Sequence, residues 1–292
     1  MNRFFLIANK DKDKDFIMTG KIKALIENMG GECYIRKSDV PENASSKYSY
    51  TNPDEIPENI DCIIVLGGDG TLILAARDLV RLDIPFIGVN FGNLGYLAEV
   101  EKQDIEETIY KLIEGKYNIE SRIMLSGTVY RDGEELKSNV ALNDIVVGRS
   151  GSLRVIDFNI YVDGIFLNQY TADGIIIATP TGSTAYNLSA GGPIVEPSAN
   201  IVVLTPVCAH TLNTRSVVLS AESGIEIEIC EDRHNTADCC DDEKIVSFDG
   251  NSNIKLIPGD RIKISKSELD TKIVKLSNKS FVEILQKKMS IK

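Results

Sequence analysis

The chain has 292 residues, of which 43% are hydrophobic and 26% are charged, a balance typical of a globular protein. Its formal net charge of −11 at pH 7 argues against nonspecific binding to nucleic acid or anionic membranes, because both need a surplus of Lys and Arg. No apolar run approaches the roughly 20 residues that span a bilayer. We therefore expect a cytoplasmic protein of two domains, without a nucleic-acid or membrane partner.

The first third of the chain alternates short apolar runs with helical patterns, which is typical of βα units on a parallel sheet. Apolar, β-branched runs predict the strands, and apolar residues three or four positions apart predict the helices. The predicted strands are 4–8, 62–66 and 86–89, and the predicted helices are 18–29, 72–82 and 105–113. This alternation predicts a Rossmann-like α/β domain over residues 1–120.

The character of the chain changes near Tyr117. From there to about Ser277, alternating and β-branched segments predict a mostly antiparallel β domain over residues 121–277. Asp132-Gly133 and Asp163-Gly164 are hairpin turn signals within it. The clearest predicted strands are 126–130, 155–162, 225–229 and 262–265. A C-terminal helix at 280–289 is expected to lay one apolar face on a neighbouring surface.

The six cysteines fall at irregular intervals without a CxxC pair, so neither a zinc ribbon nor a disulfide framework is indicated. We expect most of them to be buried, reduced thiols. Adjacent Cys239 and Cys240 lie in a polar stretch, which favours an exposed loop over a metal or redox site.

The strongest local motif is the loop Gly67-Gly68-Asp69-Gly70-Thr71 between a predicted strand and a predicted helix. Glycines allow close approach of a ligand, and the N–H groups of a helix N-terminus suit phosphate. The loop lacks the lysine and the spacing of a Walker A motif, and it is not GxGxxG. A carboxylate in a phosphate cradle repels the ligand unless it binds a metal or takes a proton. Asp69 is therefore a candidate base or Mg²⁺ partner, with a plain helix cap as the alternative.

Two further clusters lie in the β domain. The pair Asn143-Asp144 precedes a buried strand, where an amide and a carboxylate suit vicinal ribose hydroxyls, although such a pair also commonly forms a turn. Residues 171–197 contain a strand and then a run of small and hydroxyl residues around one aromatic residue, Tyr186. Small residues permit close approach to a flat ring, and nearby hydroxyl groups, such as that of Ser183, could fix it by hydrogen bonds.

Together these motifs resemble the NAD kinases. The matching segments, in chain order, are GGDGT at 67–71, VNFGNLGYLAE at 89–99, LNDIVV at 142–147, the TADG…TPTGSTAY…SAGGP block and PVCAHTLNTRSVV at 206–218. The GGDG element is shared with diacylglycerol-type lipid kinases and phosphofructokinases. The TPTGSTAY…SAGGP block is far more specific to NAD kinases.

The resemblance implies roles for particular residues. Asp69 would accept the proton of the 2′-hydroxyl of the adenosine ribose of NAD, with Gly68 and Gly70 beside the nucleotide. Asn143 and Asp144 would contact ribose hydroxyls and phosphate. The positions that match the NAD-binding residues of the second domain are Asp173, Thr184, Ala185, Tyr186 and Ser189. Arg154 stands near a basic residue of relatives, and His210 would lie near the diphosphate or serve in packing.

The resemblance also implies an N-terminal α/β domain, a β-rich C-terminal domain and a C-terminal segment, here 278–292, that returns to the first domain. The phosphoryl donor would be ATP with Mg²⁺ or another divalent cation, and some relatives use inorganic polyphosphate. A homodimer or homotetramer is expected. The residues do not identify metal ligands. Relatives commonly have glutamine where this chain has Asn251, so the resemblance implies no contact at that position.

Two rival functions remain open at this stage. A lipid kinase would share the GGDG loop, but it needs an apolar or basic membrane-facing surface that this acidic sequence does not display. A non-catalytic NAD sensor would keep the pocket and lose the chemistry. The presence of Asp69, Asn143 and Asp144 argues against the sensor.

Overall fold

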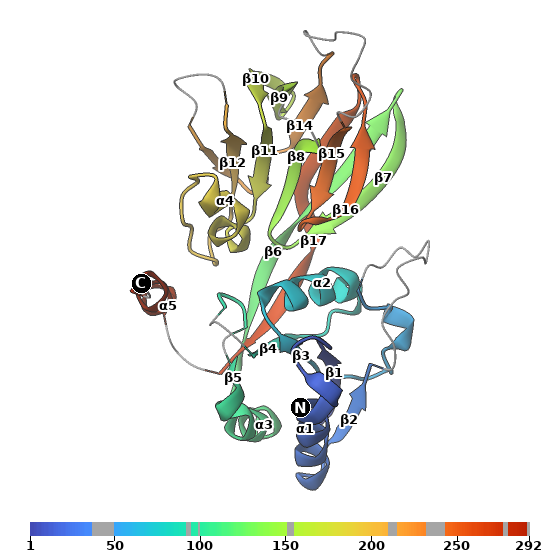
Figure 1. The fold of residues 1–292 in the computed structure, drawn as a ribbon, viewed down its shortest axis with the longest axis vertical. Coiled ribbons are helices and arrows are strands. Elements are labelled where there is room, and N and C mark those ends of the chain that lie inside the picture. Colours follow the sequence, from blue (N-terminus) through green and yellow to red (C-terminus); the bar gives the residue numbers. More distant parts are fainter. Residues whose placement is uncertain are drawn as a thin grey trace. The chain divides into compact units, whose positions relative to one another are not determined.

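The computed structural model describes residues 1–36, 50–91, 95–98, 100–150, 155–209, 215–231, 243–276 and 280–290. The chain forms two compact units. The first unit is Met1–Arg122 together with Asp270–Lys292, and the second unit is Ile123–Leu269. Two long strands, β6 (Asn118–Arg131) and β17 (Arg261–Lys275), carry the chain from one unit into the other (Figure 1). The last residues of β17 therefore belong to the first unit, ahead of the expected return at residue 278.

The first unit is built on a parallel sheet, as its alternating sequence predicts. Its strands run in the order β4-β3-β1-β2, with β5 and the end of β17 also parallel to β4. The strands are β1 (Arg3–Ala8), β2 (Glu32–Ile35), β3 (Cys62–Gly67), β4 (Phe86–Asn90) and β5 (Val100–Glu101). Every residue of β3 and of β4 is buried, because helices cover both faces of a parallel sheet.

Three helices pack on this sheet. They are α1 (Ile17–Asn28), α2 (Asp69–Leu79) and α3 (Ile105–Ile113). Ile22 of α1 and Ile109 of α3 join the cluster that includes Phe4 and Ile64, so these two helices share one face. Leu72 of α2 lies against Gly88, on the opposite face. Short 3-10 helices flank these elements at Lys14–Phe16, Pro53–Glu55, Val80–Leu82 and Lys102–Asp104.

The second unit contains antiparallel strands in two layers. One layer has the order β10-β9-β14-β17, with the β6–β7 hairpin joined to β17, and the other has the order β13-β12-β11-β8-β15-β16. Its strands besides β6 and β17 are β7 (Glu134–Ala141), β8 (Asp144–Ser150), β9 (Ile156–Val162), β10 (Ile165–Ala172), β11 (Gly174–Ala178), β12 (Ile201–Val207), β13 (Val217–Ser220), β14 (Ile225–Ile229), β15 (Glu243–Phe248) and β16 (Asn251–Leu256). Side chains from both layers, among them Phe158 and Phe248, form one core.

Both predicted hairpin turns are present. Asp132-Gly133 joins β6 to β7, and Asp163-Gly164 joins β9 to β10. In each turn both residues have positive φ, at 52° and 84° in the first and 50° and 78° in the second. This is the type I′ geometry that two-residue hairpins require, and Asp-Gly adopts it readily. Asp249-Gly250 forms a third turn of this kind, between β15 and β16.

The C-terminal helix differs from expectation in how it packs. Helix α5 (Phe281–Met289) starts with a capping box formed by Ser280 and Glu283. No residue of α5 is fully buried, but Phe281, Ile284 and Leu285 are partly buried while Met289 is 72% exposed, so the expected apolar face is covered only in part. Lys288 adds a contact of its own, since its Nζ lies 4.3 Å from the centre of the Tyr96 ring. Within the described residues, no helix is long and apolar enough to span a membrane.

Candidate functional site

The loop Gly67–Thr71 forms the junction between β3 and α2. Gly67 ends the strand, and a Cβ added there would lie 2.6 Å from Oγ1 of Thr71, so a side chain does not fit. Gly68 is the N-cap residue of α2, and the helix has no side-chain cap. Asp69 is the first helical residue, so the interpretation of Asp69 as an N-cap is wrong. A Cβ added at Gly70 would meet nothing within 4 Å. The first-turn N–H groups of α2 thus meet no side-chain cap.

The Asp69 carboxylate is hydrogen-bonded to the backbone of the segment that follows β4. It accepts N–H groups from Tyr96 at 2.7 Å, Leu97 at 3.2 Å and Ala98 at 2.9 Å. Gly95 must be glycine here, because a Cβ would lie 1.8 Å from the carboxylate oxygen. Asp69 therefore fixes residues 95–98 beside the start of α2, a contact that its local sequence does not reveal.

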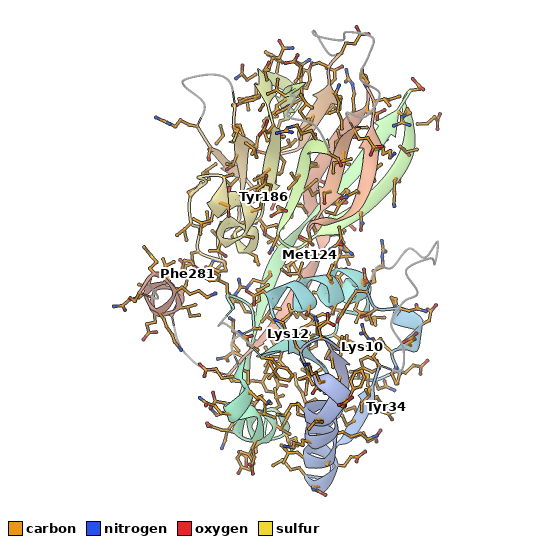
Figure 2. All side chains as sticks on the ribbon, in the orientation of Figure 1. Lys10, Lys12, Tyr34, Met124, Tyr186 and Phe281 are labelled. Carbon is orange, nitrogen blue, oxygen red and sulfur yellow. The ribbon has the colours of Figure 1, made fainter. Side chains whose placement is uncertain are left out.

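A lysine from another strand end reaches this loop. Lys12 follows β1, and its Nζ lies 3.0 Å from the position that a Cβ on Gly68 would occupy (Figure 2). The same segment is tied to α2 by a 3.3 Å hydrogen bond from Asn9 to the hydroxyl of Thr71. Lys12 was not among the residues predicted for the site. The available signal was that the carboxyl ends of neighbouring parallel strands, here β1 and β3, meet at one edge of a sheet.

The second unit contains a cavity of about 630 Å³ on the outer face of the β8–β11–β15 sheet. Strand alternation explains its lining: Asp144, Val146 and Gly148 of β8 face the cavity, whereas Ile145 and Val147 face the core. The lining residues are Asn143, Asp144, Val146, Gly148, Arg149, Asp173, Gly174, Ala185, Tyr186, Val207, Ile245, Ser247, Asp249 and Gly250. We refer to it below as the β-unit cavity.

The β-unit cavity brings together five residues that the sequence singled out. They come from three separate segments: Asn143 and Asp144 at the start of β8, Asp173 before β11, and Ala185 and Tyr186 at the start of the short helix α4 (Tyr186–Ser189). Tyr186, labelled in Figure 2, is 47% exposed and lines the cavity. This convergence of an amide, carboxylates and a ring is what a nucleoside site needs.

Thr184 and Ser189 do not line the β-unit cavity. The Thr184 hydroxyl donates to the Thr181 carbonyl at 3.3 Å, within the 3-10 helix Thr181–Thr184. The Ser183 hydroxyl is fully buried and donates to the Pro180 carbonyl at 2.6 Å. In this structure the hydroxyl groups of Thr184 and Ser183 hold the turn itself, and ligand contacts by Thr184 and Ser189 stay predictions.

The backbone of this turn packs directly on Asn143. A Cβ on Gly182 would lie 2.1 Å from the Asn143 carbonyl oxygen. Thr179 adds two hydrogen bonds, from its N–H to the Asn143 carbonyl at 2.8 Å and from its hydroxyl to the Leu142 carbonyl at 2.6 Å. The TPTG sequence thus fixes the backbone that carries the Asn143-Asp144 pair, and glycine is the only residue that allows the close approach.

Charged groups cluster in the β-unit cavity. Arg149 forms an ion pair with Asp173, with 3.2 Å between Nε and Oδ1, and this arginine was not among the predicted site residues. Asp144 is 5% exposed, and its burial, together with the negative charge of Asp249, raises its pKa from 3.8 to about 7. The cavity therefore holds a carboxyl group that titrates near neutral pH.

Two of the predicted site residues, Arg154 and His210, lie outside the described residues, as do Cys239 and Cys240. Among the residues that the structure describes, no group of three or more His, Cys, Asp or Glu side chains gathers in a way that would hold a metal ion. The sequence prediction left the metal ligands unassigned, and the described side chains do not supply a protein cage for one.

A Gly-rich loop at a helix N-terminus in an α/β unit, and a polar cavity with a ring in a β unit, define a nucleotide-binding protein of the phosphotransferase class. Comparison with known families narrows this class. The ATP-NAD kinase N-terminal domain matches residues 10–117, and the ATP-NAD kinase C-terminal domain matches residues 142–276. The chain belongs to the NAD kinase family, whose members phosphorylate NAD to NADP.

Individual relatives agree with this assignment. The NAD kinase of Agathobacter rectalis is 48% identical over 289 residues, covering 99% of each chain. The NAD kinase of Lachnospira eligens is 44% identical over 295 residues, covering 99% of this chain and 100% of the relative. The expected function is confirmed by this full-length similarity.

Two solved structures share the fold. Yeast NADH kinase complexed with NADH superposes with a TM-score of 0.84 at 23% identity, covering 100% of this chain and 88% of that one. An NAD kinase from Archaeoglobus fulgidus in complex with ATP gives a TM-score of 0.78 at 26% identity, covering 99% and 100%. The expected fold class, a parallel α/β domain followed by an antiparallel β domain, is confirmed.

Proposed function

We propose that this chain binds NAD in the β-unit cavity and phosphorylates the 2′-hydroxyl of its adenosine ribose with ATP. The observation that carries the proposal is the convergence of Asn143, Asp144, Asp173, Ala185 and Tyr186 on one cavity. A volume of about 630 Å³ is within the range of small-molecule sites. The proposal assigns the recognition of NAD to the second unit.

Within the cavity, each group has a chemical task. The Asn143 amide and the Asp144 carboxyl group hydrogen-bond the ribose hydroxyls, since an amide both donates and accepts. Tyr186 contacts the adenine through its ring face, and small neighbours such as Ala185 allow the base to approach. Thr184 and Ser189 are proposed to contact the nucleotide from the same turn. Arg154 and His210 keep the roles that the resemblance implies, near the phosphates.

In the first unit, the Gly67–Thr71 loop is proposed to hold the phosphates of ATP. Gly68 and Gly70 present backbone N–H groups without side chains in the way, and the α2 dipole favours an anion at this end. Asp69 is proposed to accept the proton of the 2′-hydroxyl. A phosphoryl transfer needs alignment and compensation of charge more than covalent help from the protein.

Mg²⁺ is proposed to arrive with the donor. Mg²⁺ usually keeps several waters and binds one or two carboxylates together with substrate phosphates. Polyphosphate is a second candidate donor, because the loop is proposed to bind phosphate groups and not the adenine of ATP. We further propose a cytoplasmic homodimer or homotetramer, as in the family.

The test of the function is formation of NADP from NAD, ATP and Mg²⁺ by the purified chain, read with an NADP-specific dehydrogenase. Replacing ATP by polyphosphate in the same assay identifies the donor. Calorimetric titration of NAD into Asn143→Ala tests the cavity, with Asn168→Ala as the matched control, because Asn168 is an exposed residue of β10 that does not line the cavity. Unchanged NAD affinity in Asn143→Ala would place the nucleotide elsewhere.

A further inference from the structure

The third type I′ turn of the second unit carries a carboxylate that faces the β-unit cavity. Asp249 and Gly250 form this turn between β15 and β16, with φ of 50° and 71°, and Phe248 pairs with Asn251 across it. β15 is antiparallel to β8, and Phe248 pairs with Ile145. The turn therefore lies beside the start of β8, where the Asn143-Asp144 pair is located.

The Asp249 side chain accepts three backbone hydrogen bonds from consecutive residues. Leu142 N–H donates to Oδ2 at 2.9 Å, and Asn143 and Asp144 N–H donate to Oδ1 at 2.7 Å and 3.2 Å. The Asp249 N–H in turn donates to the Asp144 carbonyl at 3.0 Å. An ionised carboxylate is the side chain suited to this task, because both of its oxygens accept and neither donates.

The backbone of residues 142–144 is thus held from two sides. Thr179 binds the carbonyl groups of Leu142 and Asn143, and Asp249 binds their N–H groups. Leu142 is fully buried, so its N–H would have no access to water if Asp249 were removed. These hydrogen bonds restrain both the donors and the acceptors of the segment, and so they restrain the positions from which the side chains of Asn143 and Asp144 enter the cavity.

We propose that Asp249 is a positioning residue of the NAD site: it holds the backbone of Leu142–Asp144 so that Asn143 and Asp144 meet the nucleotide in a fixed geometry. The inference rests on the proposed function of the β-unit cavity. It assigns to Asp249 a task that neither its hairpin position nor its neighbours in sequence reveal. The hairpin geometry alone requires only Asp-Gly or Asn-Gly, without any acceptor for residues 142–144.

Electrostatics agrees with this placement. The charged side chains that line the cavity are Asp144, Arg149, Asp173 and Asp249. Burial is the larger cause that raises the pKa of Asp144 to about 7, and the negative charge of Asp249 is the second. Removal of the Asp249 charge therefore lowers the pKa of Asp144, while the part of the shift that comes from burial remains.

The test is Asp249→Asn. Asparagine also favours the type I′ turn and keeps one carbonyl oxygen, but its NH₂ group replaces one of the two acceptors and cannot accept the third N–H. We expect KM for NAD to rise about tenfold, the worth of one hydrogen bond to a charged group. NAD binding is expected to depend on pH with a midpoint near 7, the pKa of Asp144. In Asp249→Asn we expect this midpoint to move to lower pH. This movement follows from the loss of the Asp249 charge alone, so KM is the measure of positioning: a purely structural role would lower the melting temperature without raising KM for NAD at a temperature where the variant is folded.

Asp132→Asn is the matched control, since Asp132 occupies the same position of a type I′ turn, with φ of 52°, and does not line the cavity. Its KM for NAD and pH midpoint should equal those of the parent chain. Asn143→Ala distinguishes failure of the proposed NAD site from failure of the role of Asp249. If Asn143→Ala leaves NAD affinity unchanged, the proposed site fails. If Asn143→Ala weakens NAD binding but Asp249→Asn leaves KM for NAD unchanged, the positioning role of Asp249 is overturned, whether or not the pH midpoint moves.

Discussion

The Asp69 carboxylate accepts the backbone N–H of Ala98 at 2.9 Å, which ties the first residue of α2 to the segment after β4. Tyr96 and Leu97 donate to the same carboxylate. Asp69 thus organises its surroundings in addition to the proton-accepting role proposed for it. Any change at Asp69 is expected to affect both the chemistry and the local fold, and an experiment has to separate the two effects.

The substitution Asp69→Asn keeps the size of the side chain but removes its charge and one acceptor. We expect kcat to fall by about 10²–10⁴, the usual contribution of a positioned acid–base group. The melting temperature should fall as well, because the N–H of Tyr96 or those of Leu97 and Ala98 lose their acceptor. NAD affinity, measured by calorimetry, should stay near that of the parent chain, since the β-unit cavity belongs to the other unit.

Asp104→Asn is the control for this change, because Asp104 precedes α3 in the same unit, is exposed and makes no side-chain cap. It should leave kcat and melting temperature unchanged. Near-normal turnover in Asp69→Asn would remove Asp69 from the mechanism and leave only its contact with residues 95–98.

Tyr186→Ala is expected to raise KM for NAD with little change in kcat. An aromatic ring at an adenine site acts through stacking and shape in the ground state as well as in the transition state. Tyr186 is 47% exposed, so its removal should hardly affect the melting temperature. Tyr110→Ala is a matched control, since Tyr110 is 50% exposed on α3 and does not line the cavity. A collapse of kcat at unchanged KM would contradict the stacking role.

Helices and strands were predictable where the local pattern of apolar and turn residues was sufficient to define them. Strand 225–229 and helix 105–113 have the predicted bounds, because their periodicity is strong and turn residues flank them. α2 begins three residues earlier than expected, at Asp69, because glycine positions in GGDGT were assigned to the loop. α5 forms as expected, but its packing could not be predicted, since an apolar stripe does not identify the surface that would cover it.

The residues of the β-unit cavity were predictable only in part. Tyr186 and the Asn143-Asp144 pair stood out through their motifs and through the resemblance. Arg149 and Asp249 did not, because their contribution depends on strand pairing: Asp249 reaches residues 142–144 only after β15 pairs with β8. Contacts between residues about 100 positions apart leave no local pattern in the sequence. The same holds for Lys12, which meets Gly68 through the parallel pairing of β1 and β3.

Gly182→Ala should weaken NAD binding through the backbone. The added Cβ would lie 2.1 Å from the carbonyl oxygen of Asn143, so Asn143 has to move. Overpacking of this kind costs about 1–3 kcal/mol of stability, and we expect a lower melting temperature together with a rise in the Kd for NAD of about tenfold or more. Gly20→Ala is the control, because a Cβ there meets nothing within 4 Å in α1. It should stabilise the chain by about 0.5–1 kcal/mol. Normal NAD affinity in Gly182→Ala would show that the turn yields without displacing Asn143.

Asp144→Asn is expected to reduce NADP formation while stabilising the fold at high pH. In the folded chain the pKa of Asp144 is about 7, above the value of about 3.9 in an unfolded chain. The folded state therefore binds the proton more tightly, so the free energy of unfolding is highest at acid pH and declines as the pH rises from about 4 to about 7. Above pH 7 the folded chain bears a buried charge beside Asp249, at a cost on the order of a few kcal/mol. The neutral amide that Asp144→Asn introduces avoids this cost, so the variant should melt at a higher temperature than the parent chain at pH 8 and at nearly the same temperature at pH 4.5.

Melting curves of Asp144→Asn and the parent chain at both pH values check this prediction, with Asp132→Asn as the control at an exposed turn. An equal difference in melting temperature at pH 4.5 and pH 8 would show that Asp144 does not titrate between them.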